Sequence, residues 1–125
     1  MESKRKILIV EDSSASRKLL TVVLDRAGYD IVEAANGLEA INLARVTQPD
    51  LIIMDIEMPE MSGDQVLEQV KADASTQHIP VIIITVHDRD SLPVQRAIAA
   101  GAAKVIYKPA SPKAIEDEVR QFLFP

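Results

Sequence analysis

The chain has 125 residues, of which 47% are hydrophobic and only 3% aromatic, and it contains no cysteine. This length fits one domain built around aliphatic side chains, and the lack of cysteine excludes disulfides, thiolate metal sites and cysteine nucleophiles. The net charge of −5 argues against non-specific binding to nucleic acid.

Short apolar runs alternate with amphipathic segments, which predicts a repeating strand–helix fold with a parallel sheet. Side-chain oxygens at Asn36, Ser62 and Ser111 suit the position just before a helix. In chain order we predict a strand at Lys6–Val10, a helix at about Ser14–Ala27, a strand at Ile31–Ala34, a helix beginning after Asn36, a strand at Leu51–Met54, a helix beginning after Ser62, a strand at Val81–Ile84, a helix at about Leu92–Ala100, a strand at Val105–Tyr107 and a final helix beginning after Ser111.

The composition of the strands predicts their order in the sheet. The first, third and fourth strands are continuously apolar, as expected of strands covered on both faces. The second and fifth carry charged residues, as edge strands often do. This favours an α/β doubly wound fold with five parallel strands in the order 2-1-3-4-5. Ligands of such folds bind at the carboxyl ends of the strands, here between the first and third.

Polar side chains follow four of the five apolar runs. Glu11 and Asp12 follow the first run, Asp55 the third, Thr85 the fourth and Lys108 the fifth. If the strands are parallel, these groups meet at one edge of the sheet. Carboxylates without a neighbouring histidine or cysteine favour Mg²⁺, which keeps several waters. Such an aspartate can attack phosphorus, and a metal, an ammonium and a hydroxyl would share the charge that builds on the phosphoryl oxygens.

Taken together, these motifs resemble the receiver domain of bacterial two-component response regulators, of the chemotaxis-regulator type. The resemblance covers about residues 6–123 and implies a flavodoxin-like fold. It rests on Ile7-Leu8-Ile9-Val10-Glu11-Asp12, Met54-Asp55-Ile56-Glu57-Met58-Pro59, Met61-Ser62-Gly63, Thr85 and Lys108-Pro109.

The resemblance implies a role for each matching residue. Asp55 would accept a phosphoryl group from a histidine kinase or a phosphotransfer protein. Asp12 would bind Mg²⁺ directly, together with Asp55 and the backbone carbonyl of Glu57, and Glu11 would hold the ion through water. The chain would catalyse only its own phosphorylation and dephosphorylation. Thr85 and Lys108 would contact the phosphoryl oxygens. The Lys108–Pro109 bond is often cis in this family, which would aim the lysine into the site.

Two positions depart from the family's pattern. Val86 follows Thr85, where the family usually has a small residue, and its bulk could narrow access to Asp55. Val105 stands where the family usually has a tyrosine or phenylalanine that changes rotamer on activation. Tyr107 lies two positions along, on the same face of the strand. Whether it replaces the missing aromatic ring is left open.

Two further positions are expected to modulate the site. Glu57 and His87 stand two residues after Asp55 and Thr85, where the family tunes the lifetime of the phosphoryl group. We expect both residues to set the rate of autodephosphorylation by controlling the attacking water.

The resemblance also implies how the signal leaves the domain. Phosphorylation would change the surface of the fourth helix, fifth strand and fifth helix, which would bind a downstream protein; a homodimer is left open. We expect a single cytoplasmic domain over residues 1–125, with no output domain, no membrane segment and no direct nucleic-acid partner. The exposed candidates on this surface are Gln95, Arg96, Lys104, Glu116, Asp117 and Arg120.

Three other functions compete with this interpretation. A phosphatase of the haloacid-dehalogenase type would carry its nucleophile after the first strand, whereas Asp55 follows the third. A flavin carrier would need a hydroxyl-rich phosphate loop where Glu11 and Asp12 stand. A degenerate receiver that only binds partners fits Val86 and Val105, but it conflicts with the complete set of Asp12, Asp55, Thr85 and Lys108.

Overall fold

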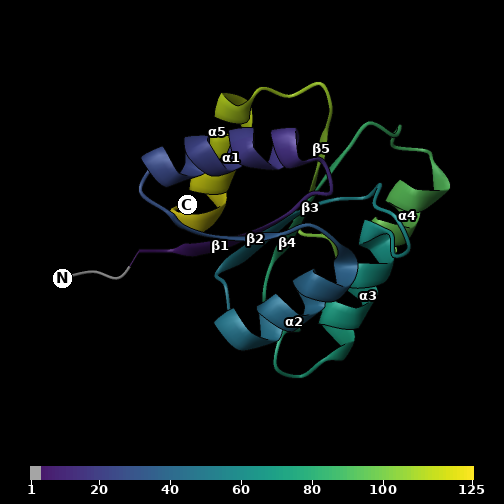
Figure 1. Ribbon diagram of the computed structural model, residues 1–125. Coiled ribbons are helices and arrows are strands. Elements are labelled where there is room, and N and C mark those ends of the chain that lie inside the picture. The colour runs from purple at the N-terminus through teal and green to yellow at the C-terminus, as the bar shows by residue number, and fades with distance from the viewer. Residues whose placement is uncertain (1–3) are drawn as a thin grey trace.

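The computed structural model describes residues 4–125, and five strands alternate with five helices along them (Figure 1). Every predicted element is present, and predicted bounds differ from the observed ones by no more than one residue. The strands are β1 (Lys6–Val10), β2 (Asp30–Ala34), β3 (Leu51–Asp55), β4 (Val81–Thr85) and β5 (Lys104–Tyr107). The helices are α1 (Ser14–Arg26), α2 (Gly37–Thr47), α3 (Gly63–Ala72), α4 (Leu92–Ala99) and α5 (Pro112–Leu123).

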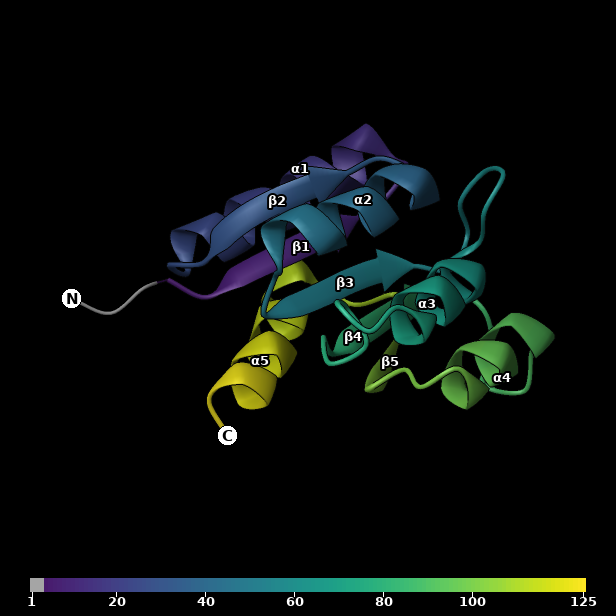
Figure 2. The same cartoon turned by 90° about the horizontal axis from the view of Figure 1, so that it is seen from below.

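The strands form one parallel sheet in the order β2-β1-β3-β4-β5, which confirms the predicted topology. Helices α1 and α5 lie on one face of the sheet, and α2, α3 and α4 lie on the other (Figures 1 and 2). No helix within residues 4–125 is long and apolar enough to cross a membrane.

Two apolar cores, one on each face, explain why the central strands are apolar throughout. Ile7 and Ile9 of β1 pack with Leu24 of α1 and Val119 of α5. The intervening Leu8 packs with the α2–α4 layer. Successive side chains of a strand point to opposite faces, so a strand covered on both sides needs an apolar residue at every position.

The predicted caps place the helices. The Asn36 side chain accepts a hydrogen bond from the backbone N–H of Glu39, at 2.9 Å, and the Ser111 side chain accepts one from Ala114, at 3.0 Å. Side-chain oxygens at these positions satisfy amide groups that have no partner inside the helix. The β-strands and capped helices together leave the loops after β1, β3, β4 and β5 side by side at one edge of the sheet.

One surface assignment was wrong. Glu116 on α5 was expected to be exposed, but it is only 6% exposed. Lys113 Nζ lies 2.8 Å from one of its carboxylate oxygens and Arg120 lies 2.6 Å from the other. These two side chains cover the carboxylate, which the position of Glu116 on its helix did not reveal.

Candidate functional site

The predicted site residues meet at the carboxyl edge of the sheet. Asp55 is the last residue of β3 and Thr85 is the last residue of β4. Asp55 is 9% exposed and Thr85 is fully buried. Parallel pairing places Asp55 beside Ile84, and Thr85 beside Tyr107, which directly precedes Lys108. The register of the strands therefore brings the carboxylate, the hydroxyl and the amine to one place.

Both carboxylate oxygens of Asp55 accept hydrogen bonds. The Lys108 ammonium donates to Oδ2 at 3.0 Å, and the backbone N–H of Glu57 donates to Oδ1 at 3.1 Å. The same ammonium lies 3.8 Å from Glu11 Oε2. Lys108 thus contacts Asp55 of β3 and lies near Glu11, which follows β1, so the amine and these acids meet at one edge of the sheet, as the sequence predicted.

The site holds more negative charge than its lysine balances. Burial raises the pKa of Glu11 to about 7, and the charge of Asp55 adds to this, although the Ser13 backbone N–H and Lys108 favour the ionised form. Burial alone would lower the pKa of Lys108, but the hydrogen bond and charge of Asp55 outweigh it and raise the pKa overall. A second positive charge at this edge would relieve the repulsion between the carboxylates.

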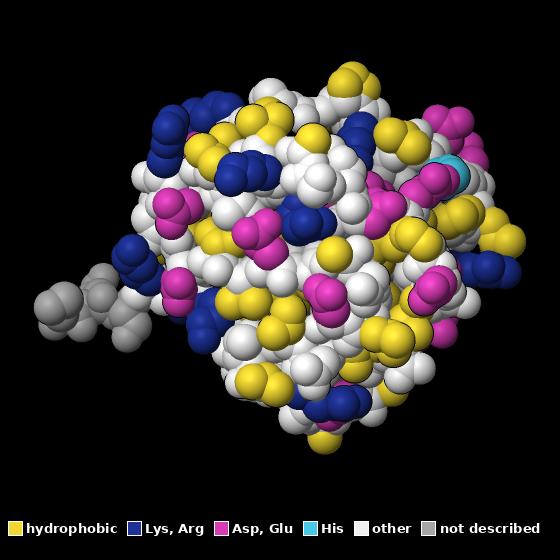
Figure 3. Space-filling view, in the orientation of Figure 1, with side chains coloured by type: hydrophobic (Ala, Val, Ile, Leu, Met, Phe, Trp, Pro, Cys, Tyr) yellow, Lys and Arg dark blue, Asp and Glu magenta, His cyan; other side chains and the backbone are white. Residues whose placement is uncertain are grey.

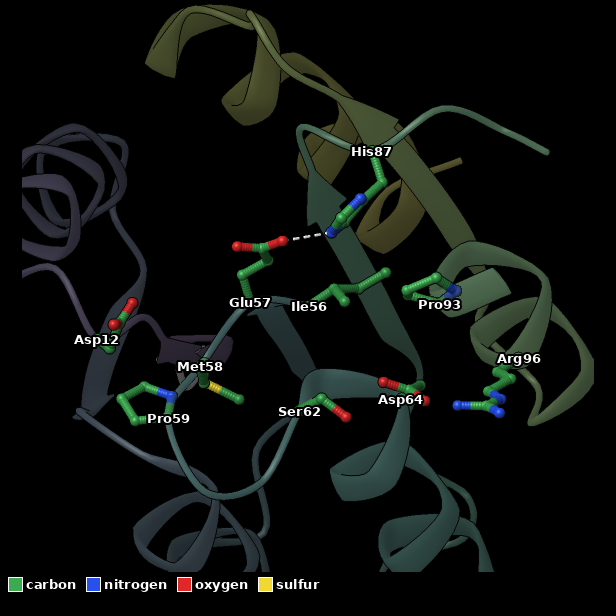
Figure 4. A pocket seen from close by; sticks show the side chains of 10 residues that line it. All are labelled: Asp12, Ile56, Glu57, Met58, Pro59, Ser62, Asp64, His87, Pro93 and Arg96. Carbon is green, nitrogen blue, oxygen red and sulfur yellow. Dashed lines mark ion pairs between the residues drawn. The ribbon is translucent and has the colours of Figure 1, made fainter. Parts of the chain in front are cut away.

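The acidic groups suit a hard cation, although they do not form a closed cage. Among residues 4–125, no three acidic, histidine or cysteine side chains converge as a preformed metal site. Asp12 is exposed and lies at the rim of a cavity beside Glu57 (Figure 4). Mg²⁺ needs only one or two carboxylates and keeps water on its other positions. Glu11, Asp12 and Asp55 carry carboxylate oxygens, the kind of ligand that Mg²⁺ prefers.

The loops after β3 and β4 are joined across the mouth of this cavity. The Nε2 atom of His87 lies 2.5 Å from Glu57 Oε1, as the dashed line in Figure 4 marks. The backbone N–H of His87 donates a hydrogen bond to Thr85 Oγ1 at 3.0 Å. The sequence named Glu57 and His87 as modulating residues, but their contact depends on the shapes of two loops and was not predicted.

Two cavities flank the site. The first, of about 410 Å³, lies between the β3–α3 loop and α4 and is lined in part by residues that sequence reasoning did not assign to the site, Asp64 and Arg96 among them. The second, of about 490 Å³, lies between α1 and the β5–α5 loop. Val86 is 65% exposed and lines this second cavity together with Lys108 and Pro109.

The other predicted positions belong to β5 and to the peptide bond that follows Lys108. Val105 and Tyr107 are half-buried and pack against the same core, which confirms that they share one face of β5. The Lys108–Pro109 bond is cis, as the resemblance implied.

Gly63 fixes the distance between α3 and the end of β3. Its N–H donates to the carbonyl of Ile56 at 2.8 Å. A Cβ atom at this position would collide with the backbone oxygen of Asp55 and lie 2.9 Å from the Cα of Ile56. Only glycine allows this approach, which explains its place in the Met61-Ser62-Gly63 motif.

Comparisons with known proteins agree with this arrangement. A family model described as the response regulator receiver domain matches residues 7–120. The polar-differentiation response regulator DivK of Brucella anthropi is 36% identical over 119 residues, which cover 95% of this chain and 96% of that protein.

Solved structures show the same fold. The chemotaxis response regulator CheY4 of Vibrio cholerae superimposes with a TM-score of 0.88 at 28% identity, covering 95% of this chain and 98% of that one. The receiver domain of the sensor histidine kinase PA1611 of Pseudomonas aeruginosa, in which a magnesium ion is coordinated in the active site cleft, has a TM-score of 0.88 at 21% identity and covers 98% of this chain and 100% of that one. The family match disagrees with the phosphatase and flavin-carrier alternatives.

Proposed function

Because this chain belongs to the response regulator receiver domain family of two-component phosphorelay signalling, we propose that Asp55 is its phosphoacceptor. One observation carries the proposal. Asp55 ends the central strand β3 with its Oδ2 atom 3.0 Å from the Lys108 ammonium, while the Thr85 hydroxyl ends the neighbouring strand. A nucleophile, a cation and a hydroxyl thus meet at the topological switch edge where doubly wound folds bind ligands.

The proposed reaction is a phosphoryl transfer to a carboxylate. An oxygen of Asp55 attacks the phosphorus of a phosphohistidine, the P–N bond breaks, and the departing imidazole nitrogen takes up a proton. An acyl phosphate results. Lys108 is already held against Asp55 and would stabilise the phosphoryl oxygens as charge develops on them. Thr85 would donate its hydroxyl to another of these oxygens, leaving the N–H of His87.

Magnesium is the proposed cofactor. Asp12, Asp55 and the backbone carbonyl of Glu57 would hold it, with Glu11 acting through water. The raised pKa of Glu11 supports this assignment, since it reflects a burial and a crowding of acids that a cation would offset. When bound, the ion would neutralise charge on the carboxylates and on the transferred group. The magnesium in the active site cleft of the PA1611 receiver domain supports the same choice of metal.

A single experiment tests the phosphoacceptor. The protein is incubated with Mg²⁺ and acetyl phosphate, and its intact mass is measured. We expect one added phosphoryl group in the wild type and in Asp25→Asn, which changes an exposed aspartate on α1. We expect none in Asp55→Asn. An adduct of equal yield in Asp55→Asn would rule out Asp55, and sustained hydrolysis of unrelated phosphomonoesters would show a phosphatase instead.

The pair formed by Glu57 and His87 is proposed to set the lifetime of the acyl phosphate. It joins the loop that follows Asp55 to the loop after β4, and both residues line the first cavity, so the pair is placed to control a water molecule that approaches from there. We expect Glu57→Ala and His87→Ala to change the rate of phosphate loss from the phosphorylated protein. Decay at the wild-type rate in both variants would refute this role.

Receiver domains interact with histidine kinases and with downstream effectors. For this chain we propose a histidine kinase or phosphotransfer protein as the donor, and a downstream protein that binds α4, β5 and α5. The side chains proposed for that contact are Gln95, Arg96, Lys104, Asp117 and Arg120, all exposed. Glu116 is left out of this surface because Lys113 and Arg120 cover it.

A further inference from the structure

The first cavity contains a buried acid that phosphoryl transfer does not use. Asp64 stands in the first turn of α3, is only 4% exposed and lines the cavity. Within residues 4–125, none of the hydrogen bonds or ion pairs involves its carboxylate, and its oxygens are not among the fully buried polar atoms, so they keep contact with solvent in the cavity. The amino-terminal end of α3 favours a negative charge at this place, but a largely buried carboxylate without a direct partner loses much of its hydration. The position therefore favours a cation nearby.

Arg96 is the positively charged side chain that faces Asp64. It belongs to α4, lines the same cavity, and turns its guanidinium end toward Asp64 (Figure 4). No ion pair joins the two side chains in this structure. Helices α3 and α4 already share a buried core through Val66 and Val94, and the cavity of about 410 Å³ lies beside that contact, lined by both Asp64 and Arg96. Closing the pair would tighten the packing of α4 on α3.

The loop that leads to α4 is tied to the phosphorylation site. Thr85 Oγ1 accepts the N–H of His87, the second residue of the β4–α4 loop. If the hydroxyl turns toward a phosphoryl group on Asp55, the hydrogen bond that ties the β4–α4 loop to Thr85 would be weakened. A shift of this loop toward the β3–α3 loop would narrow the cavity between Arg96 and Asp64.

We propose that Asp64 and Arg96 are a positioning pair, whose ion pair closes across this cavity when Asp55 carries a phosphoryl group and holds α4 against α3. The proposal rests on Asp55 being the phosphoacceptor. A contact made only in the phosphorylated state stabilises that state, and by linkage it strengthens the binding of a phosphoryl analogue by the same factor. Neither residue touches the reacting atoms, so both act through the position of α4.

The test measures that linkage with beryllofluoride, a tetrahedral analogue of the phosphoryl group, in the presence of Mg²⁺. Its affinity is determined for the wild type, Asp64→Asn, Arg96→Gln and the double variant. We expect each single variant to bind it about fivefold more weakly, at the low end of typical coupling between sites. The double variant should be no weaker than the weaker single one, and Arg96→Lys should retain most of the affinity.

Arg89→Gln is the matched control, because Arg89 is an exposed arginine of the loop before α4 and does not line the cavity. It should bind beryllofluoride like the wild type. Arg96→Gln keeps the test valid whatever Asp64→Asn does to folding, since Arg96 is exposed. Wild-type affinity in both single variants would overturn the pair, as would losses that multiply in the double variant.

Phosphorylation by acetyl phosphate is measured in parallel by intact mass. An adduct on Asp55 together with equal beryllofluoride affinities would refute the positioning pair and leave the phosphoacceptor intact. No adduct in the wild type would refute the phosphoacceptor, and the positioning pair with it.

Discussion

The two ends of the sheet treat their charged groups in opposite ways. At the amino end, charges have close partners: Asp50 accepts the N–H of Lys6 at 2.8 Å, and Lys71 donates to the carbonyls of Gln77 and Ile79, at 3.1 and 2.7 Å. At the carboxyl end, Glu11 and Asp55 share a single contacting lysine, Lys108, among the described residues. The charged side chains therefore have close partners at the amino end of the sheet, whereas the carboxyl end has fewer positive than negative charges.

Two acids show the consequence. At the carboxyl-terminal end of α3, hydrogen bonds from Arg45 and Ser75 lower the pKa of Asp73 to about 2. Burial, with the neighbouring Asp55, raises the pKa of Glu11 to about 7 at the site. Functional sites often hold groups whose pKa is strongly perturbed by burial and by a neighbouring charge in a cleft. The raised pKa of Glu11 therefore supports the proposed cation at the carboxyl edge.

Removing Lys108, the lysine that contacts both Glu11 and Asp55, should have the largest effect on the carboxyl end. We expect Lys108→Met to slow phosphorylation by acetyl phosphate about 100-fold or more, because one preorganised donor to developing charge is worth about 10²–10³ in rate. The rate is followed by intact mass at saturating Mg²⁺. Lys18→Met, on the exposed side of α1, should leave the rate unchanged. Equal rates in the two variants would show that Lys108 only balances charge at rest.

A methyl group at Gly63 should damage both stability and site. We expect Gly63→Ala to lower the free energy of unfolding by about 1–3 kcal/mol, because the new Cβ collides with the backbone of Asp55 and Ile56, which form the strand end. Urea denaturation measures the loss. Ser62→Ala, which changes the helix cap without adding an atom near β3, should cost about 1 kcal/mol. A Gly63→Ala protein as stable as the wild type would mean that α3 can slide away from β3.

Much of this site could be predicted from the sequence because parallel strands impose it. An apolar run that ends in Asp55 or Thr85 fixes both a strand and the place of its last side chain, and the order of strands then brings the ends together. No comparable rule governs side chains that leave helices and loops. The contact between Glu57 and His87, and the burial of Asp64, depend on the path of two loops that hydrophobic patterns do not encode.

Glu116 shows the same limit on a helix. Its place on α5 predicted exposure, and its backbone is where it was expected. Its carboxylate is buried because Lys113 and Arg120, three residues before it and four after it, fold over it. Long basic side chains can cover a neighbour in this way, so exposure inferred from helical position alone is least reliable beside lysine and arginine.

Magnesium should neutralise part of the excess negative charge at the carboxyl end of the sheet and so stabilise the folded protein. We expect Mg²⁺ at ten times its dissociation constant to stabilise the folded protein by about 1.4 kcal/mol, since it binds the native state only. Thermal unfolding with and without the ion measures the shift. Asp12→Asn and Asp55→Asn should each reduce it, whereas Asp50→Asn, at the opposite end of the sheet, should not. A shift of equal size in all three variants would place the ion elsewhere.

Breaking a satisfied pair at the amino end should have the smallest effect. The Arg45 side chain lies 2.6 Å from Asp73 and is the main reason that the pKa of Asp73 falls from 3.8 to about 2. We expect Arg45→Gln to raise that pKa toward 3.8, leaving the part that Ser75 contributes. NMR titration of the Asp73 carboxyl measures the change, and Arg26→Gln serves as an exposed control on α1.

The sign of the pH dependence follows from the direction of this shift. An acid whose pKa is lower in the folded state contributes stability above its unfolded pKa, and this contribution disappears as the pH falls through the folded value. The wild type should therefore exceed Arg45→Gln in stability above about pH 4, the difference should shrink as the pH falls through about 2, and the two should converge below it. Because Asp73 and Arg45 are in contact with solvent, the difference should also shrink in high salt. A difference that persists undiminished at pH 2 and below would come from packing by the arginine side chain, and the amino end would then owe its stability to shape rather than to charge.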